Sequence, residues 1–180
     1  MLYIPGIIFM TYFYVSVKKS DLPDDSPMLV DTINTVIFNV LTTELLYFIG
    51  YLYDPFIYVS LSATNLILFF IAQDIYFYLV HKYVFHGPLW FMHHNHHLYI
   101  TSYLAWYCNI VEHLLLNVGS VVFAFWLFPN TRWIFVLIIC LQTYTSVNGH
   151  TTTSPHSVHH RFPNKRYGSI YLLDRMLNSF

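Results

Sequence analysis

The chain is poor in charge. Only 9% of its 180 residues are Asp, Glu, Lys or Arg, whereas 56% are apolar. A soluble domain carries about a quarter charged residues, so this shortage argues against an ordinary soluble domain and favours lipid as the solvent. Tyr and Phe, 16 of each, suit the aromatic belts of membrane proteins. The net charge of −1 provides no basic excess that would indicate a nucleic-acid partner.

Cysteine is also scarce, and several cofactor motifs are missing. Cys108 and Cys140 lie in apolar stretches without CxxC spacing, which favours buried free thiols over a disulfide or a metal site. The sequence has no haem-attachment motif and no Gly-rich dinucleotide fingerprint. Any reducing power must therefore come from a separate protein.

The apolar segments predict an all-α integral membrane bundle. A spanning helix needs about 20 mostly apolar residues. Residues 1–17 are marginal in length and lack signal-peptide features, so we expect a retained span or an interfacial helix. Residues 31–53 and 56–80 form the next spans, and 110–128 with 133–147 form a helical hairpin. We expect about four spans in all, with residues 1–72 as N-terminal spans and 73–180 as a histidine-rich domain of one integrated fold.

This topology gathers the histidines on one side of the membrane. Residues 81–109 and 148–180 emerge together, and they hold ten of the eleven histidines. Seven of the eight Lys and Arg residues fall on that side, with only Arg132 on the other. The positive-inside rule then predicts that a helical histidine cap faces the cytosol.

The histidines form three boxes. They are His81 with His86, then His93-His94-Asn95-His96-His97, and finally His156-Ser157-Val158-His159-His160 after an isolated His150. Each HxxHH pattern places its three histidines on one helical face, so we expect each set to point at one spot. Pro88 follows Gly87 and Pro155 follows Ser154, as at helix starts.

The first box is less regular. His86 is five positions after His81, which leaves the two rings about 140° apart on an ideal helix. Either the helix is distorted there, or the two rings serve different metal ions.

So many imidazoles exceed the coordination of one ion. Neutral imidazole suits iron, zinc and copper, and a structural zinc site closes with four ligands. We therefore predict two metal ions, with iron as the metal that would activate O₂. The Glu-x-x-His pattern of soluble di-iron bundles is absent. His94 is not needed for the HxxHH register, and His113 is interpreted as an interfacial histidine.

Three acidic residues could support the ligands. Asp74 lies two helical turns before His81, and an ionisable residue inside a span is a functional candidate. It could accept a hydrogen bond from the distal N–H of a metal-bound histidine and fix its tautomer. Glu112 and Asp174 are similar candidates, although Asp174 could equally pair with Arg166 or Arg175.

These residues together resemble the fatty acid hydroxylase/sterol desaturase superfamily of membrane di-iron enzymes. The resemblance runs from about Gln73 to Leu177. It includes Asp74-Ile-Tyr-Phe-Tyr before His81, the three boxes, Glu112, Tyr167-Gly168-Ser169 and Asp174-Arg175.

The resemblance implies a di-iron centre that cleaves O₂ and abstracts hydrogen from an unactivated C–H bond, with electrons from a separate haem or flavin protein. The implied function is hydroxylation or desaturation of a sterol or fatty acyl chain, in the endoplasmic reticulum if the cell is eukaryotic. Carried over by position, the implied metal ligands are His81, His86, His93, His96, His97, His156, His159 and His160, with His150 as a ninth.

The pattern departs from the family in ways that concern the substrate. Four residues separate His81 and His86, as in fatty acid 2-hydroxylases and carotene ring hydroxylases, whereas many sterol-oxidising members have three. Leu173 replaces the usual Trp before Asp-Arg, and Asn178-Ser179 replaces the usual Gly-Thr. A carotenoid-type ring hydroxylase is therefore an alternative. A non-enzymatic metal-binding or transport protein is another, and it predicts ligands along a path through the spans.

Overall fold

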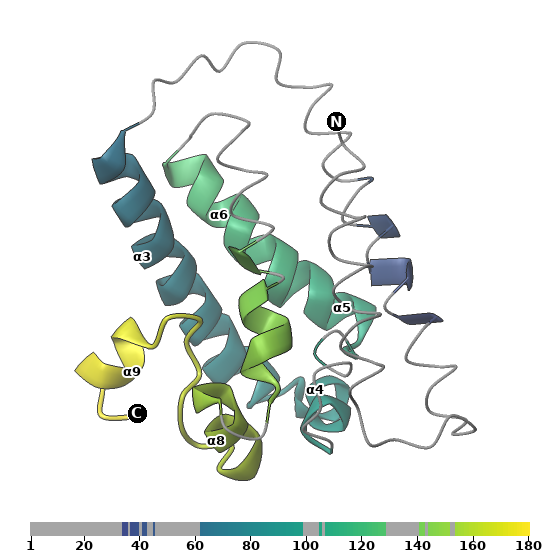
Figure 1. The fold of residues 1–180 in the computed structure, drawn as a ribbon. Coiled ribbons are helices and arrows are strands. Elements are labelled where there is room, and N and C mark those ends of the chain that lie inside the picture. Colours follow the sequence, from purple (N-terminus) through teal and green to yellow (C-terminus); the bar gives the residue numbers. More distant parts are fainter. Residues whose placement is uncertain are drawn as a thin grey trace.

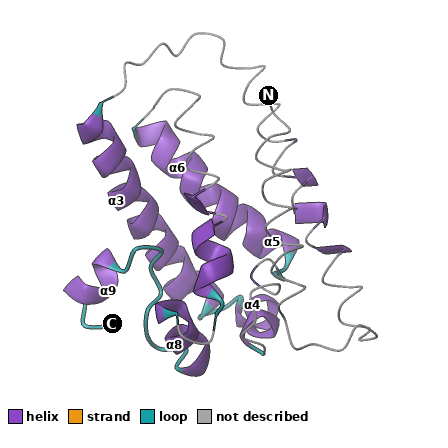
Figure 2. Ribbon diagram, viewed as in Figure 1, coloured by secondary structure: helices purple, strands orange, loops and turns teal. Residues whose placement is uncertain are grey.

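The computed structural model describes residues 34–35, 37–39, 41–42, 45, 62–98, 105, 107–128, 141–142, 144–151 and 154–180. Within these residues all regular structure is helical, as predicted (Figure 2). The expected first span, residues 1–17, lies outside the described residues. Most of the predicted span 31–53 and of the return segment 133–147 also lies outside them.

The longest described helix is α3 (Ala63–Val80), which continues without a break into the π-helix η1 (His81–Phe85). Its start is capped by Ser62, whose hydroxyl accepts the backbone N–H of Asn65 at 3.3 Å. The combined segment Ala63–Phe85 is long and apolar enough to cross a membrane. It overlaps the predicted span 56–80 and extends that helix into the first histidine box.

A second continuous rod runs from Ile110 to Leu127. It comprises α5 (Ile110–Glu112), the π-helix η3 (His113–Val118) and α6 (Gly119–Leu127). Asn109 caps its start by accepting the backbone N–H of Val111 at 2.9 Å. The rod is the second described helix with the length and hydropathy of a membrane span, close to the predicted bounds of 110–128.

Helices α3 and α6 pack side by side (Figure 1). Their contact buries Phe69 and Ala72 of α3 against Val121 and Ala124 of α6. Gly119 lets the two rods approach closely, since a Cβ there would lie 2.9 Å from the Tyr76 hydroxyl. Small residues at such a contact are typical of helix packing in membranes.

Three further helices cluster at the carboxyl-terminal end of α3 (Figure 1). They are α4 (Trp90–His97), α8 (Pro155–Arg161) and α9 (Leu172–Met176). The predicted start of α8 is confirmed: Ser154 accepts the N–H of Ser157 at 3.1 Å and Pro155 is the first helical residue. Helix α4 begins at Trp90, two residues beyond Pro88, with no side-chain cap at Leu89.

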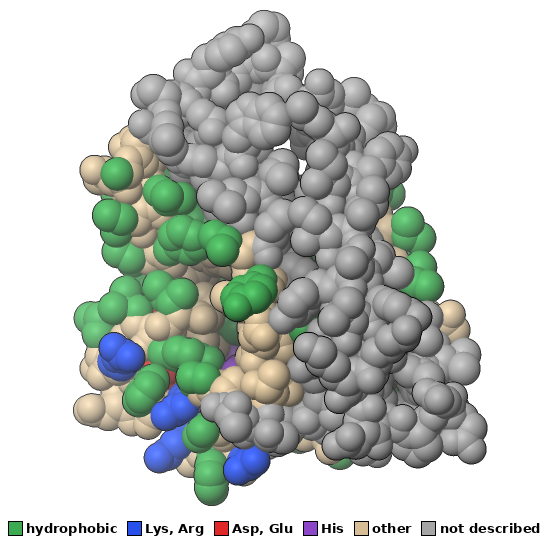
Figure 3. Space-filling view, in the orientation of Figure 1, with side chains coloured by type: hydrophobic (Ala, Val, Ile, Leu, Met, Phe, Trp, Pro, Cys, Tyr) green, Lys and Arg blue, Asp and Glu red, His purple; other side chains and the backbone are tan. Residues whose placement is uncertain are grey.

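Basic side chains gather on this cap, whereas histidine surface is scarcely visible (Figure 3). Arg161, Lys165 and Arg175 are exposed. His81, His93 and His159 are at most 1% exposed. Apart from His94, which is exposed, the histidines of the cap thus lie in its interior or are partly buried.

Candidate metal centre

Nine histidines converge in two groups, each with its potential ligand atoms within 4.8 Å of one another. The five-histidine group consists of His81, His86, His93, His97 and His159. The four-histidine group consists of His96, His150, His156 and His160. Every residue predicted as a metal ligand therefore falls in one group or the other, and each group could hold a metal ion.

Helices α4 and α8 each contribute histidines to both groups. On α4 the pair His93 and His97 joins the five-histidine group, whereas His96 joins the other. On α8 the outer pair of the same pattern, His156 and His160, joins the four-histidine group, and His159 crosses to the five-histidine group. The expectation that each HxxHH set points at one spot is therefore wrong.

The reason is the helical repeat. At about 100° per residue, positions i and i+4 differ by about 40°, whereas position i+3 lies about 100° from i+4. One HxxHH box thus presents two directions, and a pair of crossing helices can build two adjacent sites from them.

The π-helix explains the irregular first box. The N–H of His86 donates to the carbonyl oxygen of His81 at 2.8 Å, which is the i to i+5 hydrogen bond of a π-turn. Five residues therefore complete about one turn, and both rings enter the same five-histidine group. Of the two explanations left open by the spacing, helix distortion is the one observed.

The four-histidine group contains two imidazoles whose proton positions follow from geometry. The Nδ1 of His150 lies 2.7 Å from the Ser146 carbonyl oxygen, and that of His96 lies 3.3 Å from the Tyr107 carbonyl oxygen. A backbone carbonyl can only accept, so each neutral ring carries its proton on Nδ1. The two unprotonated Nε2 atoms then face each other at 3.1 Å. Two opposed lone pairs repel unless a cation lies between them.

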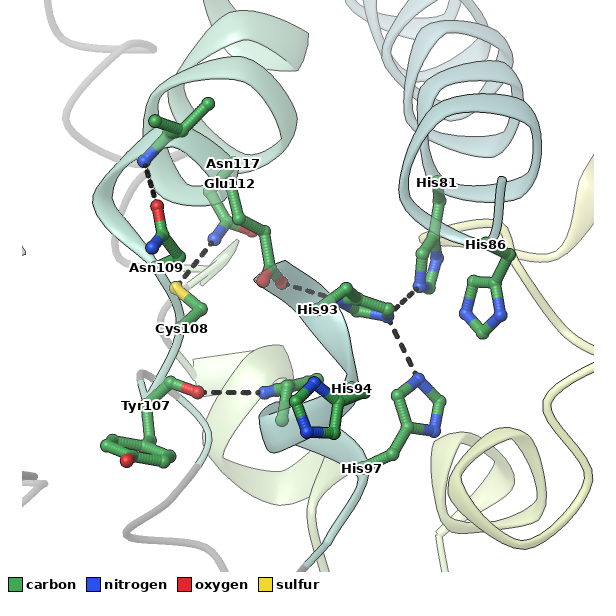
Figure 4. A network of polar contacts seen from close by, with 12 residues as sticks. His81, His86, His93, His94, His97, Tyr107, Cys108, Asn109, Glu112 and Asn117 are labelled. Atoms are coloured by element: carbon green, nitrogen blue, oxygen red, sulfur yellow. Dashed lines mark hydrogen bonds and ion pairs between the residues drawn. The ribbon is translucent and has the colours of Figure 1, made fainter. Parts of the chain in front are cut away.

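The five-histidine group repeats this arrangement (Figure 4). His81 donates from Nδ1 to the Tyr167 carbonyl oxygen at 2.8 Å, and the Nδ1 of His93 lies 2.8 Å from Glu112 Oε1. Their Nε2 atoms lie 3.0 Å apart. His159 adds a third anchored ring, with Nδ1 2.6 Å from the Lys165 carbonyl oxygen.

Burial keeps these rings in the neutral form that binds metals. It lowers the pKa of His86 and His96 to about 4, and that of His97 and His150 to about 3. Repulsion from neighbouring imidazoles adds to the lowering for His86, His97 and His150. The pKa values of His93, His156, His159 and His160 are lowered in the same way, again chiefly by burial. A protonated imidazole is thus a poor candidate for a cation between the facing Nε2 atoms.

His160 provides a second sign that the donor set suits a metal ion. Both of its ring nitrogens are buried, and within the described residues neither has a hydrogen-bond partner. Its ring centroid lies 4.8 Å from that of His97 in the other group, so the groups are adjacent. An all-nitrogen donor set of this kind fits iron, zinc or copper.

The two histidines interpreted as bystanders lie outside both groups. His94 is exposed and its Nδ1 lies 3.1 Å from the carbonyl oxygen of Phe91, on its own helix. His113 is buried in η3 and belongs to neither group. The interfacial location expected for His113 at the start of a span stays a prediction.

The three acidic candidates have different partners. Glu112 Oε1 is hydrogen-bonded to Nδ1 of a group histidine, His93, at 2.8 Å, as a supporting residue would be. Asp74 does not contact a histidine within the described chain: its oxygens accept the backbone N–H groups of Ile170, Leu172 and Leu173. Within that part of the chain, Asp74 therefore does not hold the distal N–H of a histidine, as we predicted, but binds the backbone of residues 170–173.

Asp174 likewise binds backbone. Its oxygens accept the N–H groups of Tyr167 and Gly168 at 2.9 and 2.7 Å. Within the described residues its carboxylate forms no ion pair, so the alternative of pairing with Arg166 or Arg175 is not observed.

Most of the groups that orient the rings could not be identified from the sequence. The acceptors from Ser146, Lys165 and Tyr167 are backbone carbonyls, which any residue type supplies. Of these three residues, only Tyr167 could be singled out from the sequence, because it begins the Tyr-Gly-Ser element that follows the last histidine box.

Comparison with known proteins agrees with this geometry. No curated protein and no solved structure matched the chain significantly. The fatty acid hydroxylase family model matches residues 66–179, which include most of α3, both histidine groups and the segment through Ser179. Since this match covers more than half of the chain, the protein belongs to the fatty acid hydroxylase family.

Proposed function

We propose that this protein is an O₂-dependent di-iron oxidoreductase that hydroxylates or desaturates a membrane lipid. The observation that carries the proposal is the pair of adjacent histidine groups, in which Nε2 atoms face each other at 3.0 Å (His81 and His93) and 3.1 Å (His96 and His150). Nine imidazoles in two groups suit two metal ions, one to each group. Membership in the fatty acid hydroxylase family supports iron as the metal.

Iron bound there would supply the O₂ activation needed to break an unactivated C–H bond. The chain itself orients the donors: the Nδ1 contacts of His81, His93 and His150 keep each Nε2 directed inward. Phe85 is fully buried, and its ring centroid lies 5.9 Å from that of His93. Its apolar ring helps to exclude water from this side of the group.

The location of the site supports a lipid as the substrate. Both groups lie at one end of two rods that are long and apolar enough to span a membrane. A site at that position suits a lipid that stays partly in the bilayer. We propose a fatty acyl chain or a sterol as the substrate class. A carotenoid ring is the alternative, because carotene ring hydroxylases share the four-residue spacing of the first box with fatty acid 2-hydroxylases.

We further propose that a separate haem or flavin protein delivers the electrons on the cytosolic side. The exposed basic residues Arg161, Lys165 and Arg175 of the cap fit an acidic surface on such a donor. In a eukaryotic cell we expect the endoplasmic reticulum as the compartment.

The test is expression of the full chain in a host with a compatible reductase, followed by metal quantification and untargeted lipid analysis. We expect two iron ions per chain and a new oxygenated or unsaturated lipid. The lipid product should disappear in His96→Ala and His159→Ala. Zinc alone with an unchanged lipid profile would contradict the proposal and favour a non-enzymatic metal protein.

A further inference from the structure

The C-terminal segment 167–173 is attached to the α3–η1 rod at two points. At one, the carbonyl oxygen of Tyr167 accepts the Nδ1–H of His81 at 2.8 Å. At the other, Asp74 accepts the N–H groups of Ile170, Leu172 and Leu173 at 2.8, 3.0 and 3.3 Å. Asp74 and His81 are seven residues apart on the same face of this rod. The rod therefore fixes where the segment lies relative to the His81 ring.

The start of α9 is capped by Asp74 of α3 and not by a side chain of its own N-terminal residue. The residue before α9, Tyr171, has a left-handed backbone with φ of 61° and no capping side chain. The Asp74 carboxylate binds the first two amides of α9 from outside, satisfying donors that a helix start leaves unpaired. The unusual backbone of Tyr171 is thus held from α3.

Asp174 closes the other end of the segment. It accepts the N–H groups of Tyr167 and Gly168, and the hydroxyl of Ser179 at 2.9 Å. Since the N–H of Tyr167 is held by Asp174 and its carbonyl by His81, the orientation of the residue is fixed on both sides. Asp174 therefore acts on the same carbonyl that orients the His81 ring.

The two carboxylates meet around Gly168. A Cβ at this position would lie 2.7 Å from Asp74 Oδ1 and 2.9 Å from Asp174 Oδ2, so only glycine fits without a shift. Both aspartates are 0% exposed, and within the described residues neither forms an ion pair. Two carboxylates buried without a cation are costly unless their hydrogen bonds compensate, and here backbone amides supply them.

We propose that Asp74 and Asp174 are positioning residues for the five-histidine group. Together they hold Tyr167 so that its carbonyl keeps the His81 proton on Nδ1 and directs Nε2 inward. They touch no ligand atom themselves and act through the segment 167–173. This inference rests on the proposed metal centre.

The test measures each bound metal separately in the purified full-length protein. Metal content and chelator competition are recorded for wild type, Asp74→Asn, Asp174→Asn and His81→Ala, with the electronic spectrum of the cobalt-substituted proteins. We expect each aspartate variant to bind one of the two metals about 10- to 100-fold more weakly. The cobalt spectrum of that site alone should change. The metal of the four-histidine group should keep its affinity.

A double variant separates positioning from general damage to the fold. If Asp74 acts through His81, Asp74→Asn combined with His81→Ala should bind metal no more weakly than His81→Ala alone. Additive losses, or equal weakening of both metals, would overturn the inference. A wild-type protein that binds no metal would instead refute the proposed function.

Gly168→Ala tests the same arrangement if the aspartate variants do not fold. It displaces the two carboxylates but changes no histidine, and we expect the same selective weakening. Gly149→Ala is the matched control, because a Cβ there meets His156 Cβ at an ordinary 3.6 Å. A folded Gly168→Ala protein that retains both metals with unchanged affinity would count against the inference.

Discussion

The Nε2 atoms of His96 and His150 face each other at 3.1 Å, although both rings carry their proton on Nδ1. The two residues are 54 positions apart in the chain. Neither ring can donate to the other, so the contact is favourable only with a cation between the nitrogens. This relationship makes specific predictions about which substitutions remove which metal.

Because α8 contributes histidines to both groups, we predict that substitutions of two adjacent histidines affect different metal ions. His159→Ala removes a donor from the five-histidine group, whereas His160→Ala removes one from the four-histidine group. Each variant should lose one metal or bind it more weakly, and the affected metal should differ between the two variants. Cobalt spectra of the two proteins would distinguish the two sites. Identical metal losses in both variants would contradict the division into two groups.

Substitution of Glu112 should weaken metal binding without removing a ligand. Glu112→Ala leaves the Nδ1 of the buried His93 ring without its acceptor, and loss of such a partner typically costs about 10- to 100-fold in metal affinity. Glu112→Gln keeps an oxygen that can accept the same proton, so its loss should be smaller. Chelator competition measures both, and equal affinities in Glu112→Ala and wild type would contradict the prediction.

The metal-free protein should lose stability in acid. Histidines in the unfolded chain bind protons near pH 6.5, whereas the folded pKa is about 4 for His96 and about 3 for His150. The unfolded state therefore binds more protons as the pH falls through this window. Stability should be constant above about pH 6.5 and fall toward pH 4, by at most about 1.4 kcal/mol per pH unit for each such histidine.

Thermal unfolding of the chelated protein in detergent between pH 7.5 and 4.5 measures this dependence. The metal-loaded protein, measured in parallel, should be more stable at every pH at which it retains its metal. A metal-free protein with the same unfolding temperature at pH 6.5 and 4.5 would show that these histidines are not buried in the neutral form.

The cap of α8 should contribute measurably to stability. Ser154 accepts the N–H of Ser157 and also donates from its hydroxyl to the Gly149 carbonyl. Ser154→Ala should lower the free energy of unfolding by about 1 kcal/mol, and Ser154→Asp should restore part of the loss. Thr145→Ala, which removes only a local bond of an exposed hydroxyl to the Gln142 carbonyl, is the control.

The sequence predicted the composition of the site better than its geometry. The three boxes, the apolar rods and the capped start of α8 follow from residue type and spacing, which local chemistry determines. The division of each HxxHH box between two groups depends on how α4 and α8 cross, and that is a tertiary property. The partners of Asp74 are backbone amides of residues 170–173, which no side-chain pattern reveals.

The π-turn at residues 81–85 has a consequence for how histidine boxes are compared between relatives. A π-turn takes up one additional residue while the chain on either side keeps its direction. Insertion or loss of one residue inside the first box can therefore leave both imidazoles facing the same ion. Whether three or four residues separate these histidines then records the local winding of the helix, and it need not sort enzymes by the lipid that they oxidise.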